Sequence, residues 1–240
     1  MKGMTQIMSI SVLLLSYNEE ENLKILIPKI KNELNKLNEI YGILAIDSAV
    51  PTDNTKEVCK EFEADYIPQE EPFYAGAFKT GIKYAEKDKI LVLDADASHN
   101  PKNIKDIYGK FIEDYDIVIE SRYVSSGKTN DKKSSIIMSR IFNGIMRPCI
   151  GVKAKDISTS YRMYDTKQLK AIQIKTKNYE VLQEIILRMK KNNKNLKIGE
   201  IPIKFDKRMF GESKRKLFKF ICGYIVSVFN FLFIRIGIKD

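Results

Sequence analysis

The stretch Ile90-Leu91-Val92-Leu93-Asp94-Ala95-Asp96 joins four apolar residues to two carboxylates that stand one residue apart. A short, uninterrupted apolar run is typical of a strand that is buried on both faces of a parallel sheet. Carboxylate oxygens are the ligands that Mg²⁺ and Mn²⁺ prefer in proteins. Asp94 and Asp96, which follow the strand directly, therefore predict a divalent-metal site at its carboxyl end.

Further strands and helices alternate on both sides of this stretch. Apolar runs predict strands at residues 10–15, 43–46, 66–68 and 117–119. Apolar residues recur at steps of three and four from Leu23 to Leu37, which predicts a helix that Pro28 kinks. Other helices are predicted from Thr55, over residues 76–85, and from Pro101. The alternation predicts an α/β domain with a mostly parallel sheet and helices on both of its faces.

Ligands of such sheets bind beyond the carboxyl ends of the strands. The polar residues at these predicted ends include Tyr17, Asn18, Asp47, Asp94, Asp96 and Arg122. Their carboxylates suit a cation, and the guanidinium of Arg122 matches phosphate oxygens with paired donors. We therefore expect one polar ligand site along this edge of the sheet.

Two segments differ from the rest of the predicted domain. Residues 125–135 are polar, which predicts a mobile loop. Residues 217–238 are mostly apolar, but Lys219 and Asn230 interrupt them, so the clean run is shorter than the roughly 20 residues of a spanning helix. We favour a helix at a membrane interface or against a partner, with a spanning helix and a core helix as alternatives. The expected division is a domain of residues 1–215 and an apolar helix of residues 216–240.

The composition favours a folded protein with anionic partners. Of the 240 residues 44% are apolar, and 41 Lys and Arg against 31 Asp and Glu give a net charge of +10. That excess favours phosphates, nucleic acid or an acidic membrane surface as partners. The cysteines, Cys59, Cys149 and Cys222, are far apart in the sequence, and His99 is the single histidine. A disulfide framework and a zinc site are therefore not expected, and a reducing cytoplasm is the expected setting.

Several motifs follow one another along the chain in an order that indicates a family. They are the strand and helix of residues 11–23, Asp47 with residues 52–55, residues 93–101, and Ser121-Arg122-Tyr123. Shorter elements follow at residues 156–162, 179–184 and 200–203. This order resembles family 2 glycosyltransferases with the GT-A fold, whose patterns include V-D-D-x-S-x-D-G-T, D-A-D-x-Q-H-x-P and G-S-R-Y. Ser48 and Ser98 depart from these patterns, where the family has an Asp and often a Gln.

Residues 208–214 narrow the resemblance to one branch of that family. Their sequence, Arg-Met-Phe-Gly-Glu-Ser-Lys, resembles the R-x-x-G-x-S-K motif of dolichyl-phosphate mannose synthases. The resemblance extends from residue 10 to about residue 216. It implies a metal-dependent inverting transferase that moves a sugar from a GDP- or UDP-linked nucleotide sugar to a polyprenyl (dolichyl) phosphate.

The resemblance also implies a role for each matching residue. The metal ion, Mg²⁺ or Mn²⁺, would be held by Asp94, Asp96 and Ser98. The nucleotide sugar would be bound by Tyr17, Glu19, Asp47, Asp94, Arg122 and Arg140. Catalysis would depend on Asp96, Arg122 and Asp156, of which Asp156 would orient the acceptor or act as a base. The acceptor phosphate would be bound by Arg162, Arg208, Ser213 and Lys214.

A basic cluster indicates where the acceptor lies. Residues 204–219 contain seven Lys and Arg against Asp206 and Glu212, directly before the apolar segment. A basic belt beside an apolar helix suits a phosphate-headed lipid at a bilayer. We therefore expect a peripheral protein on the cytoplasmic face of a membrane. No nucleic-acid motif is present, so a nucleic-acid partner is not expected.

Three other functions remain open at this point. A transferase that acts on a glycan or a small molecule would share the donor motifs, but would need a general base such as Asp156. A nucleotidyltransferase could use Asp94 and Asp96, although the chain lacks an obvious glycine-rich phosphate loop near its start. A protein that binds nucleotide sugars without catalysis is the non-enzyme alternative.

Overall fold

Within residues 8–130, 133–205 and 227–236, which the computed structural model describes, seven strands form one sheet in the order β3-β2-β1-β4-β7-β5-β8. They are β1 (Ser9–Leu15), β2 (Ile40–Asp47), β3 (Asp65–Pro68), β4 (Lys89–Asp94), β5 (Ile117–Ser121), β7 (Arg162–Asp165) and β8 (Ile198–Pro202). All neighbours are parallel except β7, which runs antiparallel to β4 and β5. Two short strands, β6 (Lys128–Thr129) and β9 (Lys204–Phe205), pair separately. The predicted mostly parallel sheet is confirmed.

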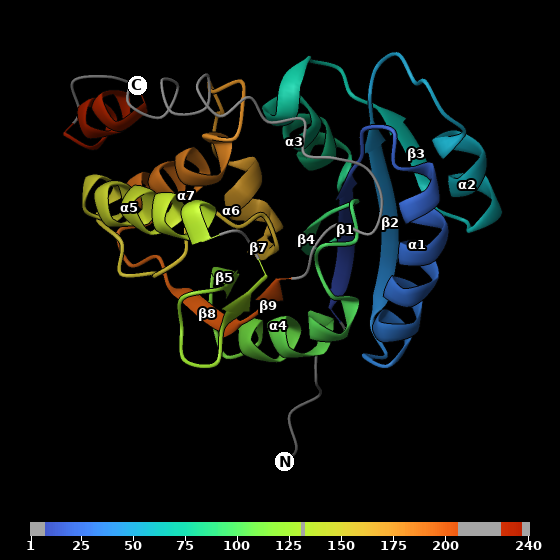
Figure 1. Ribbon diagram of the computed structural model, residues 1–240, viewed down its shortest axis with the longest axis horizontal. Coiled ribbons are helices and arrows are strands. Elements are labelled where there is room, and N and C mark those ends of the chain that lie inside the picture. The colour runs from blue at the N-terminus through green and yellow to red at the C-terminus, as the bar shows by residue number, and fades with distance from the viewer. Residues whose placement is uncertain (1–7, 131–132, 206–226, 237–240) are drawn as a thin grey trace.

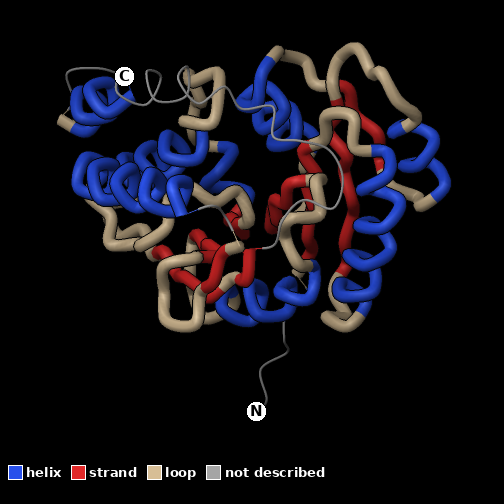
Figure 2. The backbone as a smooth tube through the Cα atoms, in the orientation of Figure 1, coloured by secondary structure: helices blue, strands red, loops and turns tan. Residues whose placement is uncertain are grey.

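Helices cover both faces of the sheet (Figures 1 and 2). They are α1 (Glu20–Asn35), α2 (Thr55–Glu61), α3 (Phe73–Tyr84), α4 (Ile104–Phe111), α5 (Lys133–Ile150), α6 (Thr166–Lys170) and α7 (Val181–Asn192), with a short 3₁₀ helix, η1 (Pro101–Asn103), before α4. Side chains alternate along β1. Ile10, Val12 and Leu14 pack in one core with α1 and α4. Leu13 and Leu15 pack in a second core with α3, α5 and α7.

The structure differs from the sequence prediction in several elements. Helix α3 begins at Phe73, before the predicted start, and Phe73 has a φ of 71°. The sequence does not predict β7, because the run Arg-Met-Tyr-Asp is not apolar. The predicted loop of residues 125–135 contains β6 and the first residues of α5. The predicted helix is confirmed as α1, which contains Pro28 at an exposed position, and the kink at Pro28 stays a prediction.

The described part of the C-terminal segment packs against the core. Residues 227–235 form a helix in which Phe231 and Ile234 are buried together with residues of α5 and α7. Arg235 donates hydrogen bonds to main-chain carbonyls at the end of α5. Among the residues that the structure describes, no helix has the length and apolarity needed to cross a bilayer. Residues 217–226 lie outside the described residues, and the division of the chain at residue 215 stays a prediction.

Glu120 is a fully buried acid in the middle of the fold. It lies on β5, and none of its surface is exposed to solvent. Burial raises the pKa of Glu120 well above its ordinary value; the nearby Asp106 adds to the rise, and Asn103 partly offsets it. The folded protein therefore holds this proton at pH values where an unfolded chain releases it.

We expect Glu120→Gln to stabilise the protein by an amount that grows as the pH rises. The unfolded chain ionises Glu120 near its ordinary pKa of 4.5, so the wild type loses stability from that pH up to the raised pKa. Each pKa unit of this window costs about 1.4 kcal/mol, and glutamine keeps the shape without titrating. Urea unfolding at a series of pH values measures the effect, with Glu57→Gln on the exposed face of α2 as the control. Parallel pH curves for Glu120→Gln and the wild type would contradict the expectation.

Candidate active site

The parallel register brings the carboxyl ends of β1, β2 and β4 to one edge of the sheet. Leu15 of β1 pairs with Ile46 on one side and with Asp94 on the other. Main-chain hydrogen bonds continue beyond the strands, from the N–H of Ser16 to the carbonyl of Ile46 at 2.8 Å. Tyr17, Asp47 and Asp94 therefore lie along the same edge. This is the edge where the sequence predicts a ligand site.

The carboxylate of Asp94 connects three parts of the fold. Its Oδ1 accepts a hydrogen bond from the hydroxyl of Tyr74 on α3 at 3.1 Å. Its Oδ2 accepts one from the hydroxyl of Ser160, which precedes β7, at 2.7 Å. Its main-chain N–H donates to Nδ1 of His99 at 3.1 Å. These contacts from α3, from the segment before β7 and from the following turn fix the orientation of Asp94.

The turn after Asp94 places a second carboxylate and a hydroxyl in a buried position. Asp96 is 5% exposed, and its Oδ1 accepts the main-chain N–H of Ser98 at 3.0 Å. Ala97 between them has a φ of 57°, in the left-handed region that side chains disfavour. The hydroxyl of Ser98 is buried and has no hydrogen-bond partner within the described residues. A buried hydroxyl oxygen in the same turn as two carboxylates fits a hard divalent cation.

The donor set that the described residues supply is incomplete for such a cation. No cluster of three or more His, Cys, Asp or Glu side chains with metal-binding geometry occurs in the described part of the chain. Mg²⁺ and Mn²⁺ commonly bind through one or two carboxylates together with water and the phosphate oxygens of a substrate. Asp94, Asp96 and Ser98 therefore fit a cation whose coordination a bound diphosphate would complete.

His99 accepts a main-chain hydrogen bond within this turn. Its ring is buried and lies 5.0 Å from the ring of Tyr161. Since Nδ1 accepts the N–H of Asp94, the proton of the neutral ring is assigned to Nε2. Burial lowers the pKa of His99, and Arg122 adds to the decrease, while Asp94 and Asp96 oppose it. The neutral imidazole is the form that can accept this hydrogen bond.

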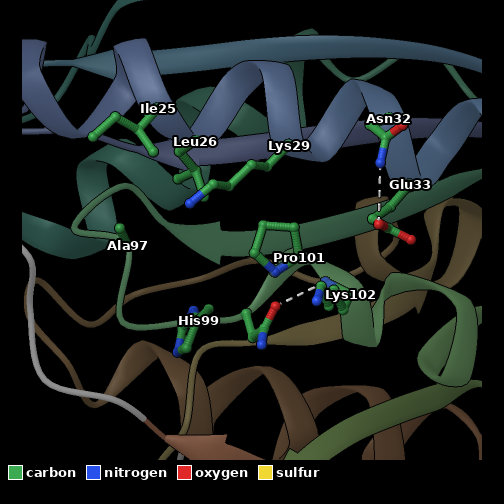
Figure 3. Close-up of a pocket in the computed structure, with 10 residues that line it drawn as sticks. Ile25, Leu26, Lys29, Asn32, Glu33, Ala97, His99, Pro101 and Lys102 are labelled. Atoms are coloured by element: carbon green, nitrogen blue, oxygen red, sulfur yellow. Dashed lines mark hydrogen bonds between the residues drawn. The ribbon is translucent and has the colours of Figure 1, made fainter.

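A cavity of about 480 Å³ lies between α1 and residues 97–102 (Figure 3). Lys29 of α1 and His99 of the turn both border it. Of the described residues that the sequence assigns to the donor, the metal or the acceptor, none lines this cavity. The cavity therefore lies on the α1 side of the turn that follows Asp94.

Three of the predicted nucleotide-binding residues, Tyr17, Glu19 and Asp47, lie near the end of β2 and the start of α1. Asp47 is 1% exposed, and its Oδ2 accepts the hydroxyl of Tyr66 at 3.3 Å. Burial raises the pKa of Asp47, while the N–H of Ser48 and the hydroxyl of Tyr66 oppose the rise. Tyr17 is 53% exposed at the rim. Glu19 immediately precedes α1 and accepts the side-chain amide of Asn22 at 2.6 Å.

Arg122 and Asp156 form a buried ion pair. The Nε of Arg122 donates to Oδ2 of Asp156 at 2.7 Å, and its Nη2 donates to Oδ1 at 3.0 Å. The main-chain N–H of Arg122 and the hydroxyl of Ser158 also donate to this carboxylate. Glu200 of β8 accepts the main-chain N–H of Asp156 at 3.1 Å. The carboxylate of Asp156 thus holds the Arg122 side chain and the start of the 156–161 segment together.

The surroundings of Asp156 bear on its predicted role as a base. Asp156 is fully buried, and both of its oxygens accept hydrogen bonds. Burial alone would raise the pKa of Asp156, but the charge and hydrogen bonds of Arg122 outweigh it and lower the pKa below its ordinary value. A carboxylate in this state is a weak general base, and its contacts are those of a residue that positions Arg122; its role in catalysis stays a prediction.

The surroundings of Arg162 bear on its predicted role in the same way. It is fully buried on β7, and its guanidinium donates to the main-chain carbonyls of Thr159, Leu182 and Ile157, each at 2.7 Å. In this structure Arg162 joins β7 to the segment before it and to α7, and its role at an acceptor phosphate stays a prediction.

Arg140 lies close to Arg122 through a shared aromatic ring. The guanidinium of Arg122 lies 5.2 Å from the ring centre of Tyr123, and that of Arg140 lies 5.4 Å from the same centre. Arg122 directly follows β5, and Arg140 lies on α5, 18 positions later. The fold therefore brings both guanidinium groups to the ring of Tyr123. The remaining predicted acceptor residues, Arg208, Ser213 and Lys214, lie outside the described residues.

The sequence does not single out Tyr74, Ser160 and Tyr66 as residues of the site. Each donates its hydroxyl to one of the carboxylates, Asp94 or Asp47, from a distant part of the chain. Only Ser160 falls within a motif of the family resemblance, at residues 156–162. For the two tyrosines no local signal is present, because their contacts exist only once α3 and β3 pack beside the strand ends.

Comparison with known proteins agrees with this geometry. The family model described as Glycosyl transferase family 2 matches residues 11–173. A dolichol-phosphate mannosyltransferase of Pyrococcus furiosus is 30% identical over 222 residues, which cover 87% of this chain and 60% of that protein. A polyprenol monophosphomannose synthase of Mycolicibacterium smegmatis is 27% identical over 217 residues, which cover 85% of this chain and 79% of that protein. The chain thus spans less than two thirds of the length of the Pyrococcus relative.

Solved structures show the same fold. Glucosyl-3-phosphoglycerate synthase from Mycobacterium tuberculosis, in complex with Mn²⁺, UDP and glucosyl-3-phosphoglycerate, has a TM-score of 0.73 at 17% identity and covers 97% of this chain and 81% of its own. The same enzyme in complex with Mg²⁺ and UDP has a TM-score of 0.70. The matched residues 11–173 make up more than half of the chain, and the chain therefore belongs to glycosyl transferase family 2.

Proposed function

We propose that this protein is a metal-dependent inverting glycosyltransferase that moves a sugar from a nucleoside-diphosphate sugar to a polyprenyl phosphate. The observation that carries the proposal is the carboxylate pair Asp94 and Asp96 at the end of β4, on the edge where Asp47 and Tyr17 also lie. Membership of family 2 supports sugar transfer. The similarity to a dolichol-phosphate mannosyltransferase and to a polyprenol monophosphomannose synthase supports the acceptor class.

Asp94, Asp96 and Ser98 are the residues that would hold Mg²⁺ or Mn²⁺. A bound cation would neutralise the diphosphate that leaves the sugar. Tyr74 and Ser160 hold the carboxylate of Asp94 in place, and the N–H of Ser98 does the same for Asp96. The choice of these metals is supported by the presence of Mn²⁺ or Mg²⁺ with UDP in the structures of glucosyl-3-phosphoglycerate synthase.

The donor would lie along the strand ends between α1 and Arg122. The buried carboxylate of Asp47 would accept hydrogen bonds from the ribose or the base, with Glu19 beside it at the start of α1. The exposed ring of Tyr17 offers an apolar face to the base. Arg122 and Arg140, gathered around Tyr123, would place positive charge near the diphosphate. We propose a GDP- or UDP-linked sugar as the donor.

The state of Asp156 favours a phosphate as the acceptor. A sugar hydroxyl needs a general base to become a nucleophile, whereas a lipid phosphate is already ionised at neutral pH. The carboxylate of Asp156, the candidate base, is committed to Arg122. A phosphate oxygen can attack the anomeric carbon without that base, so transfer to a polyprenyl phosphate fits better than transfer to a glycan.

Arg208, Ser213 and Lys214 remain the proposed ligands of that phosphate. A lipid acceptor would also place the protein at a membrane surface, which we propose to be the cytoplasmic face. The free thiols of Cys59 and Cys149 are compatible with that reducing side.

A transfer assay with three matched acceptors tests the proposal. The purified chain is incubated with GDP- or UDP-linked hexoses, Mn²⁺, and either a polyprenyl phosphate, the matching polyprenol, or a free oligosaccharide. We expect a glycosylated lipid only from the polyprenyl phosphate, and none after chelation of the metal. Sugar transfer to the oligosaccharide but not to the lipid would support the glycan alternative. Donor binding without transfer to any acceptor would support the non-enzyme alternative.

A further inference from the structure

Helix α5 presents a stripe of apolar side chains to solvent. Ile137, Ile141 and Ile145 recur every four residues, and 57%, 54% and 49% of their surfaces are exposed. Met138 beside them is 40% exposed. Four-residue spacing places these side chains on one face of a helix. We call Ile137, Met138, Ile141 and Ile145 the α5 stripe.

The helix beside α5 repeats this arrangement. In residues 227–235, Phe231 and Ile234 are buried in the core, whereas Phe229 and Phe233 are 59% and 41% exposed. Arg235 connects the two helices, because it donates hydrogen bonds to the carbonyls of Pro148 and Cys149 in the last turn of α5. Neighbouring helices thus leave large apolar side chains exposed, although each already buries its opposite face.

The charges on the two helices that carry this face have a single sign. Helix α5 contains no Asp or Glu in 18 residues, but contains Lys133, Arg140 and Arg147. Residues 227–236 also lack acidic residues and contain Arg235. At 100° per residue, Arg140 and Arg147 lie on one flank of the stripe. An apolar face flanked by cations is the pattern of helices that lie in an anionic membrane interface.

We infer that the α5 stripe, extended by the outer face of residues 227–235, docks the protein on an anionic lipid surface. The inference rests on the proposed function, because a polyprenyl phosphate lies in a bilayer. It also joins docking to the site: Ser139 of α5 accepts a hydrogen bond from Arg122 at 3.1 Å, and Arg140 shares the ring of Tyr123. A second copy of the chain would fit this face less well, because it would bring arginines of like charge together.

Vesicle flotation with single substitutions tests this docking surface. The full chain is mixed with vesicles of phosphatidylcholine, with or without phosphatidylglycerol. We expect binding to the vesicles that contain phosphatidylglycerol, and a roughly tenfold weaker partition for Ile141→Ser, equivalent to about 1.4 kcal/mol. Ile112→Ser is the matched control, because Ile112 is also 54% exposed but follows α4 on the other face of the sheet. We expect it to bind like the wild type.

Two further measurements separate docking from chemistry. Transfer to a short, water-soluble prenyl phosphate is expected to be unchanged in Ile141→Ser, because the stripe is not part of the site. If Ile141→Ser weakens vesicle binding but the wild type transfers nothing to prenyl phosphates, the proposed function fails and the docking surface stands. Equal vesicle binding by Ile141→Ser and Ile112→Ser overturns the inference. Loss of a dimer in Ile141→Ser, seen by sedimentation with vesicle binding unchanged, overturns it in favour of self-association.

Discussion

Replacing Asp96 by asparagine is expected to lower sugar transfer at least about a thousandfold while leaving the fold intact. The side chain is 5% exposed, and its Oδ1 accepts the N–H of Ser98, an interaction that an amide oxygen can keep. The substitution therefore removes the negative charge and preserves the turn. Steady-state transfer to polyprenyl phosphate over a range of Mn²⁺ concentrations measures the loss, and thermal unfolding measures the fold.

Two comparisons make this result specific. Asp96→Ala removes the charge and the hydrogen-bond acceptor together, so it should lose activity to the same extent and some stability in addition. Asp65→Asn, at the exposed start of β3, is the control for removal of a carboxylate elsewhere on the sheet. If Asp96→Asn retains transfer within tenfold of the wild type at saturating Mn²⁺, Asp96 does not hold the metal.

Asp156→Asn is expected to destabilise the protein by about 3–5 kcal/mol, the usual effect of removing one partner of a buried ion pair. The side chain of Asp156 is 0% exposed and that of Arg122 is 11% exposed, so the guanidinium would lose its counter-charge in a nearly dry environment. Urea unfolding measures the loss. Asp165→Asn is the comparison, because its ion pair with Lys89 is more exposed and should contribute less.

The pH dependence and a double substitution identify the cause of this loss. Because the folded pKa of Asp156 lies below its ordinary value of 3.8, the pair contributes full stability above that value, and the contribution disappears as the pH falls through the folded pKa. Asp156→Asn should lack this acid-sensitive contribution. Arg122→Gln combined with Asp156→Asn should cost less than the sum of the two single substitutions. Additive losses would show that Asp156 does not act through Arg122.

The sequence predicts those site residues whose positions are set by the ends of strands. The four central residues of β4 are an unbroken apolar run, so the end of the strand, and with it the place of Asp94, can be found from local pattern alone. The same holds for Asp47 at the end of β2. Parallel pairing then places both at one edge, which follows from topology and needs no knowledge of individual contacts.

The parts that the sequence does not predict depend on tertiary contacts. Arg162 stands in a motif and carries the right charge for a phosphate, but the carbonyls that bind it come from the preceding segment and from α7. The same is true of Asp156, whose role is set by Arg122, a residue 34 positions earlier. A charged residue in a motif predicts a kind of ligand. Whether its side chain faces that ligand or stays inside the protein depends on the residue or main-chain group that pairs with it.

The place of β7 in the sheet has a consequence for how the chain acquires its structure during synthesis. Strands β1 to β4 are neighbours within residues 9–94, and they can pair as soon as that stretch has emerged. β5 emerges next, yet it joins them only through β7, which begins at residue 162. Until then the outer edge of β4 has no partner, and Asp94 lacks Ser160. The nascent chain must therefore keep an apolar strand edge from aggregating while about a quarter of its length is added, and this interval is where we expect chaperone dependence to be greatest.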